Sequence, residues 1–372
     1  MKTRGALLRE QGRRAGYTID DIEIGEPRSG EVRVKLAAAG LCHSDFHYDA
    51  GDGFVDALPM LGGHEGAGIV EEVGPGVTDL AVGDRVITTF IPSCGHCRWC
   101  RDGRGNLCDR GADLLTGRAM DGSRRVHSHG EPVTPMTFLG TFAPYTVCPA
   151  DSLVKFGDDI PMTVAAIAGC AVPTGWGTAV NIAQVRQGDV AVVIGTGGVG
   201  MNAVQGARLA GAAVIVAVDP VRWKREKARE FGATHTAADL AEAHALVADL
   251  TAGVMADRAI ITVGVIPGDM IEPALGLISK GGVLALGGVG AMSTKQVSLS
   301  LFPFVMFEKQ LRGGVYGGCK PRNDVPKLLD LYRASRLKLD ELITRTYRLE
   351  DINRGYRDME EGNTIRGVIT FD

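Results

Sequence analysis

The sequence is 372 residues long, has a formal net charge of -4 and is 45% hydrophobic. A chain of this length can bury a sizeable core and is long enough for two domains. Because the lysines and arginines are spread along the chain, we find neither a basic patch for nucleic acid nor a cationic helix for a membrane surface, and we expect small molecules or proteins as partners.

The first segment, MKTRGALLREQGRRAGY, is charged and lacks the apolar core of a secretion signal. No stretch of the sequence approaches the ~18 uninterrupted apolar residues that a transmembrane helix needs. We therefore expect a cytoplasmic protein in a reducing compartment, where disulfides are rare.

Three separate segments each contain one candidate metal ligand. AAAGLCHSDFH contains Cys42, GGHEGAGIVEEVGPGV contains His64, and IAGCAVPTGWG contains Cys170. Taken singly, each of these residues is more often packed in a core than bound to a metal. Spacing alone does not show that the three residues meet.

Residues 92–109, PSCGHCRWCRDGRGNLCD, hold half of the eight cysteines in the chain. These are Cys94, Cys97, Cys100 and Cys108. Disulfides are typical of small secreted domains, and neither description suits this chain. Zinc binds four thiolates tetrahedrally, and such a set leaves no position for a substrate. The C-x2-C-x2-C-x7-C spacing therefore predicts a structural zinc site, with a loop of unliganded thiols as the alternative.

Residues 188–220 have the pattern of a strand, a glycine turn, a helix and a second strand. The β-branched run Val190–Ile194 predicts a buried parallel strand. The turn that follows satisfies G-x-G-x-x-G, which allows a pyrophosphate to approach the N-terminus of the next helix. Its glycines are Gly195, Gly197, Gly198 and Gly200. The alternative is an ordinary strand-to-helix turn.

The acidic residue that such a site requires is Asp219, at the end of the next apolar strand. Its carboxylate can accept hydrogen bonds from the ribose hydroxyls and would repel a 2′-phosphate, so we expect NAD rather than NADP. Two later segments, RAIITVG and GGVLALGGVG, predict further strands of the same sheet.

Three motifs together resemble the zinc-dependent alcohol dehydrogenases of the medium-chain dehydrogenase superfamily. They are the pattern G-H-E-x2-G-x5-G-x2-V from Gly63 to Val77, the four-cysteine loop and G-T-G-G-V-G. The resemblance covers essentially the whole chain and implies an α/β fold. Residues 1–172 and 317–372 would form a GroES-like, mainly β catalytic domain. Residues 173–316 would form an inserted Rossmann NAD-binding domain with a doubly wound parallel sheet.

By this resemblance, Cys42, His64 and Cys170 bind a catalytic zinc and leave its fourth position open. Glu65 would be a neighbouring carboxylate or a transient ligand. Asp45 would fix the ring orientation of His64.

The same resemblance extends the NAD site beyond the glycine turn and its aspartate. The additional residues are His43, Thr174, Val199, Lys224 and Arg366. Thr174 and Val199 would line the nicotinamide. Lys224 would neighbour the adenosine ribose, and Arg366 would reach the pyrophosphate. For these two basic residues the alternative is a solvated surface charge.

Ser44 and His47 occupy the positions of a proton relay in the family that the chain resembles. A histidine in that position can accept a proton and release it near neutral pH. The implied reaction is the reversible oxidation of an alcohol to an aldehyde with hydride transfer to NAD. The alternative for His47 is a histidine on the surface.

One subfamily acts on the glutathione adduct of formaldehyde, and two positions disfavour it here. That subfamily typically has an arginine where this chain has Ala112 and a tyrosine where this chain has His47. Five apolar residues occupy substrate-pocket positions, with core packing as the alternative for each. They are Phe90, Leu114, Phe138, Val289 and Val315. An apolar pocket would suit a primary aliphatic or aryl-alkyl alcohol.

Four longer segments resemble the actinobacterial alcohol dehydrogenases that depend on the artificial acceptor N,N-dimethyl-4-nitrosoaniline. They are DPVRWKREKAREFGATH, RAIITVG, LKLDELITRTYRLEDINRGYRDM and IRGVITF. This resemblance implies a tightly held NAD, an external acceptor such as mycofactocin, and a homo-oligomer, either a dimer or a tetramer. One alternative is a conventional zinc alcohol dehydrogenase that exchanges NAD. The other is a non-enzymatic zinc- and dinucleotide-binding protein, or a redox sensor built on the cysteine loop, and the presence of Ser44 and His47 argues against both forms.

Overall fold

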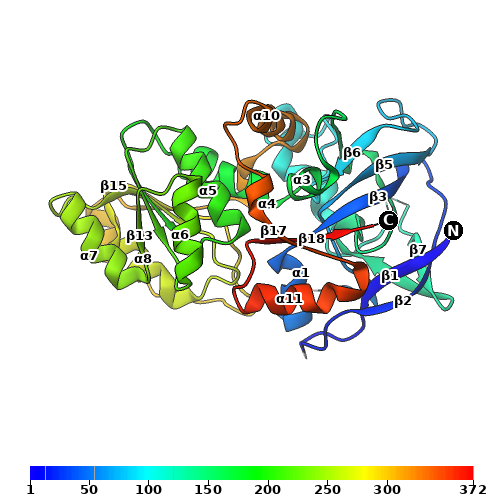
Figure 1. Ribbon diagram of the computed structural model, residues 1–372, viewed down its shortest axis with the longest axis horizontal. Helices are drawn as coiled ribbons and strands as arrows, with labels where there is room; N and C mark the ends of the chain where they lie inside the picture. The colour runs from blue at the N-terminus through cyan, green and yellow to red at the C-terminus, as the bar shows by residue number, and fades with distance from the viewer. Residues whose placement is uncertain (13, 54, 120, 372) are drawn as a thin grey trace. The chain divides into compact units, whose positions relative to one another are not determined.

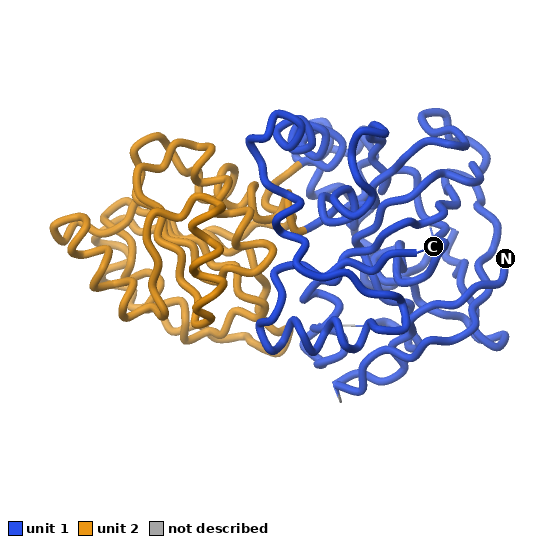
Figure 2. The backbone as a smooth tube through the Cα atoms, viewed as in Figure 1, with its two compact units in different colours: residues 1–170, 320–372 blue, residues 171–319 orange. Residues whose placement is uncertain are grey.

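The computed structural model describes residues 1–12, 14–53, 55–119 and 121–371. The chain forms two compact units, which have different colours in Figure 2. Unit 1 comprises residues 1–170 and 320–372, and unit 2 comprises residues 171–319. The boundaries expected from the sequence, after residue 172 and before residue 317, differ from these limits only slightly.

Unit 1 consists mainly of β-structure, with one closed barrel and one open sheet. The barrel has the strand order β1 (Lys2–Leu8), β2 (Thr18–Ile24), β7 (Val126–Ser128), β8 (Glu131–Pro135) and β4 (Met60–Leu61). The open sheet has the order β10 (Leu153–Lys155), β6 (Arg85–Thr88), β5 (Gly66–Val73), β3 (Glu31–Leu41), β18 (Arg366–Thr370) and β17 (Ile343–Tyr347), and β9 (Tyr145–Pro149) also pairs with β3. The long strand β3 therefore connects N-terminal and C-terminal parts of the chain in one sheet.

Short helices join the strands of unit 1. The α-helices are α1 (His43–Ala50), α2 (Arg98–Arg101), α3 (Met162–Ile167), α10 (Pro321–Arg333) and α11 (Ile352–Glu360). Apolar residues of β1, β3, β18 and α11 pack in one core cluster, which includes the aromatic rings of Tyr17, Phe142 and Tyr356.

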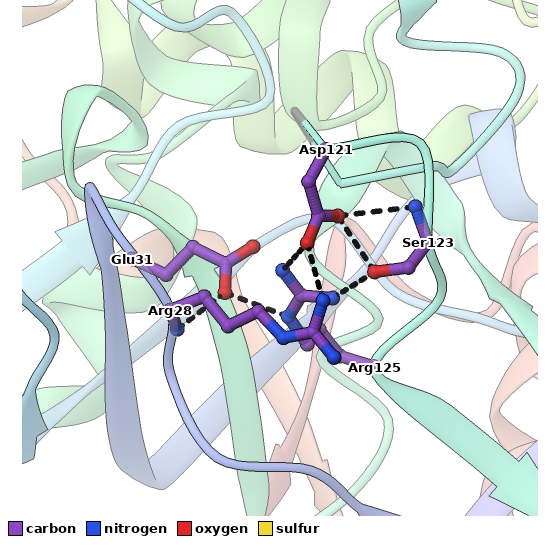
Figure 3. Close-up of polar contacts among 5 residues, drawn as sticks. All are labelled: Arg28, Glu31, Asp121, Ser123 and Arg125. Atoms are coloured by element: carbon purple, nitrogen blue, oxygen red, sulfur yellow. Dashed lines mark hydrogen bonds and ion pairs between the residues drawn. The ribbon is translucent and has the colours of Figure 1, made fainter.

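A polar network holds the loop before β7 against the start of β3 (Figure 3). Arg125 Nε donates to Glu31 Oε2 at 2.7 Å, and both side chains are buried. Asp121 Oδ2 accepts from Arg28 Nη1 at 2.7 Å and from Arg125 Nη2 at 3.1 Å, while Asp121 Oδ1 accepts from Ser123 Oγ at 2.6 Å. The Ser123 hydroxyl and the two arginines hold the pKa of the Asp121 carboxyl below its usual range, so the network is stable when that carboxyl is charged. Paired charges, rather than apolar packing, thus fix this polar loop.

Unit 2 contains a six-stranded sheet in which every strand is parallel to its neighbours. The strand order is β13 (His235–Ala237), β12 (Val214–Val218), β11 (Val190–Ile194), β14 (Ala256–Ile261), β15 (Ile278–Leu286) and β16 (Gln310–Gly313). This 3-2-1-4-5-6 order is that of a Rossmann fold, with the change of direction at β11 and β14.

Helices pack on the strands of unit 2, as Figure 1 shows. The helices of this unit are α4 (Ala171–Gly177), α5 (Gly198–Leu209), α6 (Arg222–Phe231), α7 (Leu240–Leu250), α8 (Ile271–Gly276) and α9 (Leu301–Met306), of which α5, α6, α7 and α8 contact its strands. Alternate strand residues such as Val192 and Val216 pack with α7 and α8. The intervening residues, such as Val193 and Ile215, are also buried, as expected for a parallel sheet covered on both faces.

The predicted α/β fold is confirmed, with a mainly β unit and a doubly wound parallel sheet. The strands expected at Val190–Ile194, in RAIITVG and in GGVLALGGVG correspond to β11, β14 and β15. Within the described parts of the chain, no helix is long and apolar enough to cross a membrane.

Candidate metal and cofactor sites

Four buried potential ligands form a group in unit 1. They are Cys42, His64, Glu65 and Cys170. One possible ligand atom from each residue lies within 4.8 Å of the others. The structure therefore brings together the three ligands that the resemblance implied, with Glu65 beside them as the resemblance also implied.

Neighbouring strands position these residues. Cys42 directly follows β3 and precedes the first residue of α1, while His64 and Glu65 directly precede β5. Strands β3 and β5 pair antiparallel, and Gly40 N donates to Glu65 O at 3.1 Å. Cys170 follows α3, which contacts β3. The pairing of β3 with β5 thus explains how residues distant in sequence meet.

Unsatisfied polar atoms in this group fit a bound cation. The described buried side-chain atoms without a hydrogen-bond partner include four in or next to this group: His64 Nδ1, His64 Nε2, Glu65 Oε1 and Asp45 Oδ2. A buried polar atom without a partner destabilises a fold by about 1–3 kcal/mol. A metal ion would satisfy the imidazole nitrogen, and two thiolates with one imidazole form a set that zinc prefers.

The electrostatics of the group favour the thiolate form of one of its two cysteines, which is the form that binds a metal. A hydrogen bond from the Cys170 thiol holds the pKa of Cys42 well below its usual value. Burial raises this pKa, whereas the nearby His64 lowers it further. The same hydrogen bond, together with burial, raises the pKa of Cys170. One thiolate is therefore stable in this site even before a cation is added, and a cation would favour the second.

Asp45 connects the His64 ring to the backbone. Its Oδ2 atom lies 3.3 Å from His64 Nδ1, and its Oδ1 atom accepts from Gly63 N at 2.9 Å. Asp45 is fully buried. A carboxylate near Nδ1 favours the tautomer with Nε2 free to bind a metal, and the orienting role of Asp45 stays a prediction.

Glu65 and Arg366 form a buried ion pair that the sequence analysis did not predict. Arg366 Nη2 donates to Glu65 Oε2, although the two residues are 301 positions apart. Burial raises the pKa of Glu65 to about 8, against the opposing effect of Arg366. Arg366 is 4% exposed, so it is not the solvated surface charge that was its alternative. Its expected contact with a pyrophosphate stays a prediction.

The first turns of α1 carry the residues expected to relay a proton. Ser44 Oγ lies 3.7 Å from Cys42 Sγ. His47 is 7% exposed, and its Nδ1 lies 3.7 Å from Asp52 Oδ2. The ring of the exposed His43 lies 6.5 Å from that of His47. Since His47 is buried, the alternative of a surface histidine does not hold.

The four cysteines of the loop also lie together. Within the group, each Sγ lies within 4.8 Å of the others, and the Cys97 and Cys108 sulfurs are 4.0 Å apart. Backbone N–H groups point at the sulfurs: Cys97 N donates to Cys94 Sγ at 3.4 Å and Cys100 N to Cys97 Sγ at 3.5 Å. Hydrogen bonds from backbone amides, that of Asp109 first, lower the pKa of Cys97 to about 6. None of the eight cysteines forms a disulfide. The four cysteines of the loop are therefore suited to a structural zinc.

Replacement of Cys100 by serine should remove one zinc and lower thermal stability. The loop has few apolar residues, so the free energy of zinc binding contributes directly to its folding. Metal analysis and thermal unfolding measure the two effects, while the metal at Cys42, His64 and Cys170 should be retained. A Cys100→Ser protein with its full zinc content and normal stability would contradict the assignment.

The glycine turn of unit 2 has the geometry that a pyrophosphate requires. Gly195 has φ +90°, and a Cβ at Gly200 would lie 1.8 Å from Gly195 O. Helix α5 begins at Gly198, so its free N–H groups face the turn. Thr262 Oγ1 donates to Gly195 O at 2.6 Å, and this hydrogen bond holds the first residue of the turn in place.

Asp219 directly follows β12 and lies beside this turn. Its Oδ2 accepts from Thr196 N at 2.8 Å and its Oδ1 from Val221 N at 2.9 Å. These bonds fix the orientation of the carboxylate, and its role in ribose recognition stays a prediction. Lys224 is 9% exposed, and burial lowers its pKa although Asp219 opposes that effect. Lys224 is therefore not a solvated surface charge.

Thr174 and Val199, which are also expected at the cofactor, lie in unit 2, whereas His43 and Arg366 lie in unit 1. Thr174 is half-buried on α4, and its hydroxyl has no hydrogen-bond partner among the described atoms. Val199 is half-buried in the first turn of α5, and its carbonyl lies against Gly175. A polar group on Thr174 is thus available to a ligand.

The substrate-pocket positions differ in their burial. The Phe90 ring meets the His64 ring edge-on, with centroids 5.7 Å apart. Phe138 is 8% exposed and Leu114 is half-buried. Val289 and Val315 are 59% and 41% exposed, so core packing does not explain these two residues.

Comparison with protein families identifies both parts of the chain. Residues 28–158 match the alcohol dehydrogenase GroES-like domain, and residues 198–334 match the zinc-binding dehydrogenase domain. These matches identify the mainly β unit as GroES-like.

Two relatives are similar over almost their whole length. Alcohol dehydrogenase B of Mycobacterium tuberculosis is 48% identical over 372 residues, which cover 100% of this chain and 99% of the relative. NDMA-dependent alcohol dehydrogenase of Amycolatopsis methanolica is 48% identical over 369 residues, 99% of each chain.

Solved structures agree with this similarity. An alcohol dehydrogenase zinc-binding domain protein from Burkholderia ambifaria has a TM-score of 0.92 at 32% identity, with 100% of this chain and 99% of that chain covered. Benzyl alcohol dehydrogenase from Acinetobacter calcoaceticus has a TM-score of 0.91 at 27% identity, with 100% of both chains covered.

Proposed function

Because the chain belongs to the zinc-dependent alcohol dehydrogenases of the medium-chain superfamily, we propose that it oxidises primary alcohols reversibly, with hydride transfer to a tightly bound NAD that an external acceptor reoxidises. The observation that carries this proposal is the buried group of Cys42, His64 and Cys170 beside unsatisfied polar atoms. The fourth potential ligand of this group, Glu65, is held by Arg366, which leaves three ligands for the metal, whereas the cysteine loop offers four thiols.

In this proposal, Cys42, His64 and Cys170 hold the catalytic zinc and Asp45 orients His64. Zinc in such a site supplies Lewis-acid polarisation of an alcohol or aldehyde oxygen. Glu65, held by Arg366, provides a buried carboxylate next to the ligands.

The proton that the alcohol loses would pass through Ser44 to His47. Ser44 lies next to Cys42, and His47 lies one turn further along α1. Asp52 Oδ2 lies 3.7 Å from His47 Nδ1, and the Asp52 side chain is 34% exposed, so a proton on His47 would have a route to solvent there. The relay therefore moves the proton outward without opening the metal group to water.

Replacement of His47 by glutamine should slow alcohol oxidation by about 10²-fold, the usual contribution of a positioned base. The loss should be largest at low pH, where little hydroxide can replace the imidazole. Steady-state rates across a pH series measure it, and Phe46→Leu on the same helix is the control for packing. An unchanged pH profile for His47→Gln would remove this residue from the relay.

The substrate is proposed to be a primary aliphatic or aryl-alkyl alcohol. Phe90 places an aromatic ring beside His64, which favours an apolar group near the reacting carbon. The similarity to benzyl alcohol dehydrogenase of A. calcoaceticus supports the same class. Ala112 and His47 disfavour the glutathione adduct of formaldehyde as a substrate.

The cofactor is proposed to stay bound during turnover and to pass its hydride equivalent to an acceptor such as mycofactocin. The 48% identity to a relative named for its dependence on NDMA, the abbreviation of N,N-dimethyl-4-nitrosoaniline, supports this proposal. The test is oxidation of benzyl alcohol with free NAD⁺ alone and with N,N-dimethyl-4-nitrosoaniline. Oxidation of alcohol under neither condition would contradict the proposed function.

We propose that the protein is a homo-oligomer and that it lies in the cytoplasm. Eight free cysteines suit a reducing compartment. Strand β16 lies at the edge of its sheet, and apolar residues near it are exposed: Leu301 68%, Phe302 75%, Val305 66% and Met306 62%. An apolar strip beside an unpaired edge is typical of a subunit interface. Light scattering reports the number of copies, and a monomer would contradict this part.

A further inference from the structure

Helix α11 holds the N-terminal segment of the chain at Tyr17, close to the metal group. The backbone N of Tyr17 donates to Asn353 Oδ1 at 2.8 Å, and Asn353 Nδ2 donates to Tyr17 O at 2.8 Å. This pair of bonds joins residues 336 positions apart. It fixes the backbone from which the Tyr17 side chain extends.

Aromatic packing fixes the direction of the Tyr17 side chain. Its ring stacks on Tyr356 of α11, with centroids 5.6 Å apart and planes 25° apart. Phe142 meets the same ring edge-on at 5.7 Å. Tyr17 is only 4% exposed, so its ring has little freedom and its hydroxyl points in one direction.

The Tyr17 hydroxyl ends at the residue that orients His64. It donates to the main-chain oxygen of Asp45 at 3.2 Å, and this hydrogen bond is buried. The Asp45 side chain in turn accepts from Gly63 N and lies 3.3 Å from His64 Nδ1. A continuous series of buried contacts therefore runs from α11 through Tyr17 and Asp45 to His64.

We propose that Tyr17 is a positioning residue of the catalytic metal centre, whose hydroxyl anchors the first turn of α1 so that the Asp45 carboxylate meets His64 in the orientation that metal binding requires. The inference rests on the proposed role of His64 as a ligand. Loss of a group that holds a metal-bound histidine typically costs about 10–100-fold in metal affinity. Tyr17 acts one contact further out, so we expect about a three- to tenfold effect.

Tyr356 provides a matched control in the same aromatic stack. It is 6% exposed, and its hydroxyl is one of the buried side-chain atoms without a hydrogen-bond partner among the described residues. Tyr17→Phe and Tyr356→Phe each remove one buried hydroxyl and keep a ring. Only the first removes a hydrogen bond to Asp45, so the comparison separates positioning from loss of packing.

The test measures zinc retention and cobalt spectra rather than activity. Holoenzyme, Tyr17→Phe and Tyr356→Phe are incubated with dipicolinate, and zinc release is followed by metal analysis. We expect Tyr17→Phe to release one zinc about three- to tenfold faster and to shift the visible bands of the cobalt-substituted centre. Tyr356→Phe should stay within about twofold of the wild type, as expected for a side chain that holds no ligand-orienting group. The zinc of the cysteine loop should be released equally in all three proteins.

Two results would overturn the inference. One is a Tyr17→Phe protein with wild-type zinc release and an unchanged cobalt spectrum. The other is an equal effect of Tyr356→Phe, which would assign the change to the aromatic stack. Either result leaves the proposed function intact if the wild type holds two zincs. By contrast, a Cys170→Ala protein that keeps both zincs would contradict the proposed function itself.

Discussion

Replacement of Cys170 by alanine should reduce alcohol oxidation by at least about a thousandfold, because it removes one of the three proposed ligands of the catalytic zinc. Lewis-acid stabilisation contributes several kcal/mol to the transition state, and each ~1.4 kcal/mol corresponds to about a tenfold change in rate. The variant should also contain one zinc fewer than the wild type. Rate and metal content are measured on the same preparation.

Cys148→Ala is the matched control for this experiment. Cys148 is 1% exposed, lies in the same unit, and belongs to neither cysteine-containing ligand group. It should keep both zincs and most of the activity. NAD binding should survive in Cys170→Ala, because the glycine turn and Asp219 belong to unit 2. An active Cys170→Ala enzyme would disprove the three-ligand assignment.

Cys170→Ala and Cys100→Ser should have opposite consequences. Loss of the buried centre should abolish the reaction with a small effect on folding, since β3 and β5 remain paired and packed. Loss of the loop zinc should destabilise residues 94–108, which are held by sulfur contacts rather than by a core. The two groups can thus be separated even though both contain cysteines.

Sequence reasoning located the groups whose members lie close together in the chain. The metal group of the cysteine loop could be predicted from the sequence because all its potential ligands fall within residues 94–108. The glycine turn and Asp219 could be predicted as one candidate site because a single β-α-β unit contains them. In both cases local geometry, which spacing encodes, determines the site.

Contacts between distant segments were not accessible from spacing. Cys42 and His64 meet because β3 pairs with β5, and the sequence suggested this only through resemblance to a family. The Glu65–Arg366 pair was missed because it depends on β18 pairing with β3. The role of Tyr17 was missed for the same reason, since a buried tyrosine in the sequence looks like any other core aromatic residue.

The last prediction is that the protein keeps its NAD and depends on an added acceptor. Purified protein should carry NAD(H) through gel filtration and reduce little free NAD⁺. With N,N-dimethyl-4-nitrosoaniline it should oxidise benzyl alcohol continuously. Absorbance of the eluted protein and rates under the two conditions are the measurements.

The expected difference between the two conditions is large. A cofactor that survives a column run of about 20 minutes must dissociate at no more than ~10⁻³ s⁻¹, which at a typical association rate of about 10⁶ M⁻¹s⁻¹ corresponds to nanomolar affinity. Turnover that requires NADH release cannot exceed that rate, whereas a typical kcat is about 10 s⁻¹. Added acceptor should therefore raise the steady-state rate by about 10⁴-fold or more, which is the ratio of these two rates.

A variant of the ribose carboxylate links this behaviour to the structure. Asp219→Asn keeps the size of the side chain and one acceptor oxygen, but it removes the charge that the ribose hydroxyls would contact and one of the two bonds from Thr196 N and Val221 N. If Asp219 contributes to retention, the variant should lose NAD on the column and gain acceptor-independent turnover with excess NAD⁺, because release is then faster. Cofactor-free wild-type protein that releases NADH rapidly without an acceptor would instead identify a conventional zinc alcohol dehydrogenase. Such a result would reject cofactor retention and leave the metal centre and its alcohol chemistry untouched, because the Cys42, His64 and Cys170 group does not depend on how fast the dinucleotide leaves unit 2.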